Sequence, residues 1–178
     1  MKRLPLLLPL LFLLAACAAR GPLTEDRQGN AVTFARSDTG NAVTVTLSPD
    51  LTYEKRVHRK FMGATVEGWL YRAGDGTTVV VSGMDRAKFE DLIGRTVDAP
   101  ESGIKAFPPQ TSWLPALCRL VRAYVVTLDN DVVAAVKFGP SFDGQCDGQT
   151  DNEGYMAAHL DEVAEFDRKA EQQISVDW

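Results

Sequence analysis

Alternating apolar and polar positions predict a chain built largely from β-strands. Residues 42–47 place valine or leucine at every second position, between threonines, which is typical of a strand with one buried face. Residues 31–35 are similarly rich in apolar and β-branched side chains. The turn-forming residues 37–41 separate the two segments, so the pattern predicts two neighbouring strands.

Two further pairs of strands are predicted downstream. Residues 65–71 and 77–81 flank a turn rich in glycine and aspartate, and the unbroken Val79-Val80-Val81 favours a strand buried on both faces. Residues 120–128 and 132–138 form the clearest hairpin, because only Asp129-Asn130-Asp131 separates them.

Helical spacing appears in two places. Residues 84–95 carry apolar side chains three and four positions apart and have Asp85 as a candidate N-cap. Residues 155–173 carry a longer apolar stripe opposite a charged face, which predicts a C-terminal helix. The proline-rich residues 97–115 between these regions predict an extended loop.

These elements predict a single α+β domain over residues 31–178. We expect an antiparallel sheet of about six strands, with the long C-terminal helix packed on one face. Residues 17–30 are small and polar without apolar periodicity, and are interpreted as a flexible tether. The sequence contains no internal repeat.

The N-terminus has the composition of an export signal. Lys2 and Arg3 precede an uncharged, leucine-rich run over 4–16, which is shorter than the roughly 20 residues needed to span a bilayer as a helix. The run ends in Leu14-Ala15-Ala16-Cys17, which resembles the lipobox of bacterial lipoproteins.

The lipobox resemblance implies that residues 1–16 are removed as a signal peptide and that Cys17 carries the lipid. It implies a membrane-anchored, periplasm-facing protein of the bacterial cell envelope. Ala18, standing where aspartate would favour the inner membrane, resembles the outer-membrane pattern of bacteria with two membranes. The alternative is an ordinary signal peptide followed by an unrelated cysteine.

Charge limits the choice of partner. The 19 basic and 24 acidic residues give a formal net charge of −5, which becomes more negative when Lys2 and Arg3 leave with the signal. An acidic domain is a poor candidate for binding nucleic acid, because phosphates need a compensating basic surface.

The remaining cysteines, Cys118 and Cys146, form an even pair in an exported protein. Disulfides form in oxidising compartments, so we expect a bond between them. The alternative is a reactive cysteine paired with a histidine.

One loop carries oxygen ligands at the spacing of a calcium site. Residues 143–154 resemble an EF-hand loop, with Gly148 at its turn, but Gly154 occupies the last position, where a bidentate glutamate is expected. The alternative is a solvated turn that binds no ion. Ca²⁺ is the one cofactor that the sequence suggests. The candidate ligands are Asp143, Gln145, Asp147, Asp151 and Glu153.

Two other groups are candidates for binding. A basic stretch stands out in this acidic chain and could contact an anionic partner, or could be a solvated surface; it contains Lys55, Arg56, Arg59 and Lys60. Trp69, Tyr71 and Trp113 could line an aromatic groove, although core filling is the ordinary role of such residues.

No catalytic motif is complete. Neither His58 nor His159 has a partner at metal-ligand spacing, and no nucleophile elbow or phosphate loop is present. The leading hypothesis is therefore a membrane-anchored, non-enzymatic accessory or scaffold that contacts another envelope protein. The alternatives are a ligand- or Ca²⁺-binding module, using the 143–153 loop or an aromatic face, and a cell-envelope hydrolase.

Overall fold

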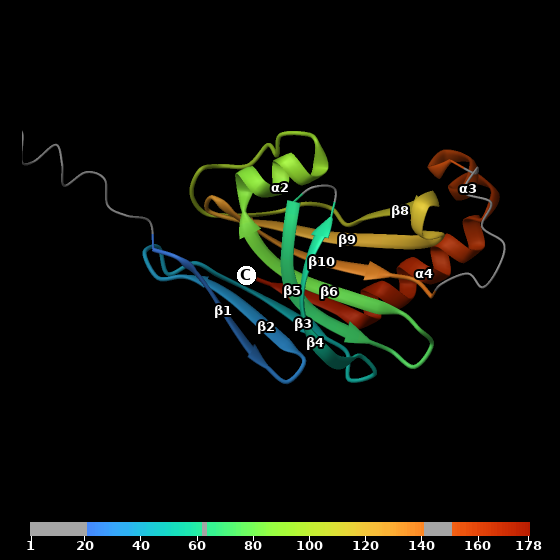
Figure 1. The fold of residues 1–178 in the computed structure, drawn as a ribbon, viewed down its shortest axis with the longest axis horizontal. Helices are drawn as coiled ribbons and strands as arrows, with labels where there is room; N and C mark the ends of the chain where they lie inside the picture. The colour runs from blue at the N-terminus through green and yellow to red at the C-terminus, as the bar shows by residue number, and fades with distance from the viewer. Residues whose placement is uncertain (1–20, 62–63, 141–150) are drawn as a thin grey trace, which may run out of the picture.

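A computed structural model describes residues 21–61, 64–140 and 151–178, which form two antiparallel β-sheets and three α-helices (Figure 1). The order of strands in the smaller sheet is β1 (Leu23–Gln28), β2 (Ala31–Arg36), β3 (Ala42–Leu47) and β11 (Ile174–Asp177). The chain therefore contributes its first three described strands and its last strand to one sheet.

The larger sheet has seven strands. Their spatial order is β4 (Thr52–Phe61), β5 (Ala64–Arg72), β6 (Thr78–Asp85), β10 (Asp131–Phe138), β9 (Arg119–Leu128) and β7 (Ile104–Ala106). Strand β8 (Gln110–Leu114) also pairs with β9, farther along the same edge. The 3₁₀ turn η1 (Pro115–Leu117) leads from β8 into β9.

The main core lies between the two sheets. Val43, Val45 and Leu47 of β3 are buried, as their alternation predicts. From the larger sheet, Val79 and Val81 of β6 pack into the same cluster and are fully buried. Val80 points to the opposite face and is half-buried, between the buried Thr78 and Ser82 on that face, so the expectation that this strand is buried on both faces is partly correct.

The smaller sheet and a helix share the inner face of the larger sheet. Helix α4 (Leu160–Gln173) runs directly into β11, and its Phe166 and Ala170 are buried. Phe166 packs with Trp113 and Leu120 in a second apolar cluster. The C-terminal helix is thus confirmed, and it continues into an unexpected strand that joins the smaller sheet.

The C-terminal helical region is divided in two. Helix α3 (Asn152–Ala158) begins at Asp151, whose side chain accepts a hydrogen bond from the backbone N–H of Gly154 at 2.7 Å. His159, with φ −125° and ψ 40°, separates α3 from α4. The prediction of one helix over 155–173 is therefore only partly correct.

Helix α2 (Arg86–Ile93) covers part of the outer face of the larger sheet. Asp85 caps it as predicted, accepting a hydrogen bond from the N–H of Ala87 at 2.9 Å. Gly94 ends it with a left-handed conformation (φ 67°), which costs glycine little because it has no Cβ.

The described residues contain eleven strands, where about six were expected. Residues 23–28, assigned to the flexible tether, form β1 and pair with β2 along their whole length. The basic stretch forms β4, and the predicted loop 97–115 contains β7 and β8. Pro108 and Pro109 separate these two because proline lacks the N–H needed for a ladder.

A polar network joins the sheets at the end where β1 begins. Arg36 is buried and binds Asp38 at 2.7 Å and Asp131 at 2.6 Å. Nearby, Asp129 accepts hydrogen bonds from Thr39 Oγ1 at 2.8 Å and from the N–H of Gly103 at 2.6 Å. These contacts hold the turn between β9 and β10 against the loop that contains Thr39 and against the loop that contains Gly103.

Candidate functional site

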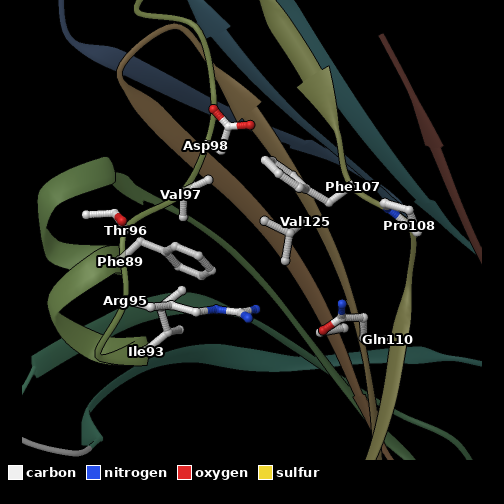
Figure 2. A pocket seen from close by; sticks show the side chains of 11 residues that line it. Phe89, Ile93, Arg95, Thr96, Val97, Asp98, Phe107, Pro108, Gln110 and Val125 are labelled. Atoms are coloured by element: carbon white, nitrogen blue, oxygen red, sulfur yellow. The ribbon is translucent and has the colours of Figure 1, made fainter.

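An open groove lies on the outer face of the larger sheet, beside α2 (Figure 2). It encloses about 390 Å³. Ala123 and Val125 of β9 form its floor, since they alternate with the core residue Val126 and so face away from the core. The walls are mainly apolar and include Phe89, Ile93, Val97, Phe107 and Pro108.

One wall is held in place by contacts around α2. After Gly94 reverses the chain, the backbone N–H of Val97 donates a hydrogen bond to Glu90 Oε1 at 2.8 Å. The Arg86 guanidinium donates to the carbonyl of Ala99 at 2.9 Å and to Asn130 Oδ1 at 2.8 Å. Residues 95–99 are therefore tied to the helix and to the β9–β10 turn.

The opposite wall arises where β7 and β8 are interrupted. The N–H of Phe107 donates to the carbonyl of Val125 at 3.0 Å, after which Pro108 and Pro109 leave the ladder. In Figure 2, Phe107 and Pro108 face the groove from this segment, across from Phe89 on α2. Two proline residues thus open the edge of the sheet beside the floor.

The rim is exposed to solvent and carries an unmatched positive charge. Arg95, Thr96, Asp98, Pro108 and Gln110 are all exposed. Asp98 has a cation partner, because Lys105 Nζ lies 3.5 Å from its carboxylate. Within the described part of the chain, the Arg95 guanidinium has no ion pair, and Figure 2 shows its side chain extending across the groove.

The groove combines an apolar floor with a polar rim. Its eleven lining residues include one hydroxyl, on Thr96, and one carboxylate, on Asp98, and no serine, cysteine, lysine or histidine. An apolar floor beside a single cation can receive an apolar group that has a carboxylate next to it. No sequence motif marks this site, since its residues come from three separate segments of the chain.

Of the predicted basic patch, the side chains of Lys55 and Arg56 are described, and each has a carboxylate neighbour, so the patch as a whole stays a prediction. Arg56 lies 2.8 Å from Glu25, and Lys55 lies 3.3 Å from Glu54. His58, in the same strand, is 3.0 Å from Glu67. The backbone of β4 is described through Arg59 and Lys60, but not their side chains. Neighbouring carboxylates therefore compensate the described basic groups of this strand.

The predicted calcium loop lies mostly outside the described residues. Asp143, Gln145 and Asp147 fall in 141–150, so the site stays a prediction. Asp151 is the N-cap of α3, and Glu153 is exposed in the first turn of the helix. In the described part of the chain, no cluster of three or more histidine, cysteine, aspartate or glutamate residues is arranged to hold a metal.

Of the three cysteines in the disulfide and lipidation predictions, Cys118 is the one that the structure describes. Cys146 and Cys17, the predicted lipidation site, are outside the described residues, so the disulfide and the anchor stay predictions. Cys118 ends the 3₁₀ turn η1 with a left-handed backbone (φ 51°). Across the described ranges, no helix has the length and hydropathy needed to cross a membrane.

The three candidate aromatic residues do not line one groove. Trp69 and Tyr71 share a face of β5, as predicted, but that face is the inner one, where Tyr53 packs against both rings. Trp113 stacks on Tyr155 in the other cluster, with ring centroids 3.8 Å apart. The three rings therefore lie in two separate apolar clusters and do not form one aromatic face.

No known protein family, curated protein or solved structure matches this chain. The function is therefore inferred from the residues of the groove and their surroundings.

Proposed function

We propose that this protein is a lipid-anchored, non-enzymatic accessory of the bacterial envelope that binds a partner protein through the groove beside α2. The occupant is an extended segment of the partner with an apolar side chain and an adjacent acidic residue. The apolar side chain packs on Ala123 and Val125, and the carboxylate pairs with Arg95.

The open rim is the observation that carries this proposal. A pocket for a small molecule buries most of its ligand, whereas every polar rim residue here is exposed. An open apolar groove with a lone cation fits a protein segment that brings its own cover. This geometry favours the scaffold hypothesis over an enclosed small-molecule site at the same place.

The proposed anchor fits a partner close to the membrane. Only five residues lie between Cys17 and Leu23, the first residue of β1, so a fully extended link of six steps spans about 20 Å. A Cβ built on Gly83 would lie 2.8 Å from Leu23 Cδ2, and Gly83 precedes α2 by three residues. The start of β1 and the α2 end of the domain therefore lie together.

Photo-crosslinking in the native membrane tests the proposal. A photo-reactive phenylalanine at Gln110, on the rim, should give one reproducible adduct with an envelope protein. The same group at Asp161, exposed on α4, is the positional control. Equal recovery of that protein from both positions would contradict a role for the groove.

Two pairs of substitutions then test the chemistry of the occupant. Ala123→Arg fills the floor, and Ala164→Arg adds the same bulk to an exposed site on α4. Arg95→Glu reverses the charge of the rim, and Lys88→Glu makes the same change elsewhere on α2. Only the groove variants should lose the adduct while the melting temperature is preserved. Loss with Ala123→Arg but not with Arg95→Glu would overturn the acidic part of the proposed segment.

A further inference from the structure

A second, smaller pocket lies at the other side of the larger sheet. It encloses about 170 Å³ between the turn that joins β5 to β6, the end of β10, and α4 (Figure 1). Leu120 and Phe166 form an apolar wall. The lining also contains charged residues of both signs: Asp75, Lys137, Glu162, Glu165 and Lys169.

Lys137 is the buried charged residue of this lining. Its side chain points to the inner face of β10 and is 1% exposed. Its Nζ lies 4.8 Å from the centre of the Phe166 ring. Burial lowers the pKa of Lys137 to about 8. Among the described residues, no carboxylate oxygen lies within ion-pair distance of Nζ, and the Phe166 ring is the nearest group that contacts the charge.

The other cations facing this region already have partners. Arg122 lies on β9, directly opposite Lys137 of β10. Its guanidinium binds Asp167 at 2.8 Å and Glu171 at 2.9 Å, both on α4. Lys169 lies 3.6 Å from Glu165, which also binds Arg168. Lys137 is therefore the buried ammonium without a matching carboxylate among these described groups.

Two carboxylates of the lining are also without a cation partner in the described part of the chain. Asp75 accepts a hydrogen bond from the backbone N–H of Thr77 at 2.8 Å. Glu162 accepts one from the Tyr155 hydroxyl at 3.1 Å. Asp75 attracts the Lys137 charge from a distance, as does Asp50 in the turn between β3 and β4, but neither reaches it. An internal cation and two peripheral carboxylates thus face one small space.

We infer that this pocket binds a small zwitterionic amino acid, with its carboxylate on Lys137 and its ammonium between Asp75 and Glu162. The ligand carboxylate supplies a counter-charge for the buried ammonium, which has no ion pair among the described residues. The ammonium adds a partner for the two peripheral carboxylates. Leu120 and Phe166 leave room for a short apolar side chain, so alanine is the natural probe.

Matched probes test which charges of the ligand are needed. Heteronuclear NMR of the folded protein follows the Lys137 side chain and nearby amides as L-alanine, propionate or ethylamine is added at millimolar concentration. L-alanine should shift these signals in a saturable way, and the two single-charge probes should bind at least about tenfold more weakly. Equal responses to L-alanine and propionate would overturn the zwitterion, and no saturable response to L-alanine would overturn the site.

Substitutions then locate the response. Lys137→Met keeps the length of the side chain and removes its charge, so it should abolish binding of L-alanine without unfolding the protein. Glu162→Gln should weaken binding, whereas Asp161→Asn, its exposed neighbour on α4, should leave it unchanged. Unaltered L-alanine binding in the folded Lys137→Met variant would overturn the assignment. These outcomes are independent of the groove beside α2.

Discussion

Arg36 and Lys137 are both buried cations on the inner side of the larger sheet, but their surroundings differ. Arg36 is 6% exposed and has two carboxylates, Asp38 and Asp131, within hydrogen-bonding distance. Lys137 is 1% exposed and has none in the described part of the chain. Strand β10 joins the two sites, with Asp131 about 20 Å from Lys137 along the strand.

This contrast separates a charge that holds the fold together from one that is available to a ligand. The two carboxylates raise the pKa of Arg36, so that its charge is stabilised by folding. Burial instead lowers the pKa of Lys137, so that folding opposes its charge. A protein keeps an unmatched buried cation at a cost in stability, which makes its pocket the better candidate for binding.

The largest expected effect comes from removing the buried partner of Arg36. Asp131→Ala should lower the free energy of unfolding by about 3 kcal/mol or more, because a buried guanidinium loses its nearest counter-charge. Chemical denaturation measures the loss, and Asp91→Ala, exposed on α2, provides the control. Equal losses in the two variants would show that the pair contributes nothing special.

A change in stability of the opposite sign is expected at the other end of β10, where Lys137 lies. Lys137→Met should raise the free energy of unfolding at pH 7 by up to about 3 kcal/mol, because it removes a buried charge without leaving a partner unpaired. A loss of stability in this variant would mean that the ammonium is matched and that the contrast with Arg36 is wrong.

The same variant should show a characteristic pH dependence. The pKa of Lys137 is about 8 in the folded protein and 10.5 ordinarily, so between these values the unfolded chain binds more protons. The stability of the wild type should therefore rise relative to Lys137→Met as pH increases from 8 towards 10.5. Denaturation midpoints at intervals across this range measure the change, and a constant difference would contradict it.

The smallest effect concerns the more exposed partner of Arg36. The Arg36 hydrogen bonds lower the pKa of Asp38 from 3.8 to about 2. The contribution of this carboxylate to stability is present above pH 3.8 and is lost as pH falls towards 2. Asp38→Asn should flatten the acid limb of the stability curve relative to the wild type. Superimposable acid limbs would assign the loss of stability to other carboxylates.

Local signals predicted several elements well. The Val-Thr alternation of β3, the Asp85 cap of α2 and the short turn between β9 and β10 each depend on neighbouring residues, and the structure confirms all three. The missed strands lack such signals. Residues 23–28 are mostly polar, and they become β1 only because β2 offers a complete ladder of backbone partners.

The sites were less predictable than the strands. Lys137 follows five apolar residues in β10 and carries no motif, and Arg95 follows Gly94 in a turn. Their significance depends on partners that are distant in the sequence, or on the lack of them. No spacing rule on a single segment would have selected either residue.

The sequence by itself determined the alternating strands, the helix cap, the acidic balance and a lipobox-like N-terminus, because each depends on residues close together in the chain. Only the tertiary structure decided that the described basic groups of β4 also face Glu25 and Glu67, and that a polar segment forms the first strand of a sheet. It likewise decided that buried Arg36 pairs with Asp131, 95 positions away, while Lys137 has no ion pair among the described residues, because such partners are brought together by the fold.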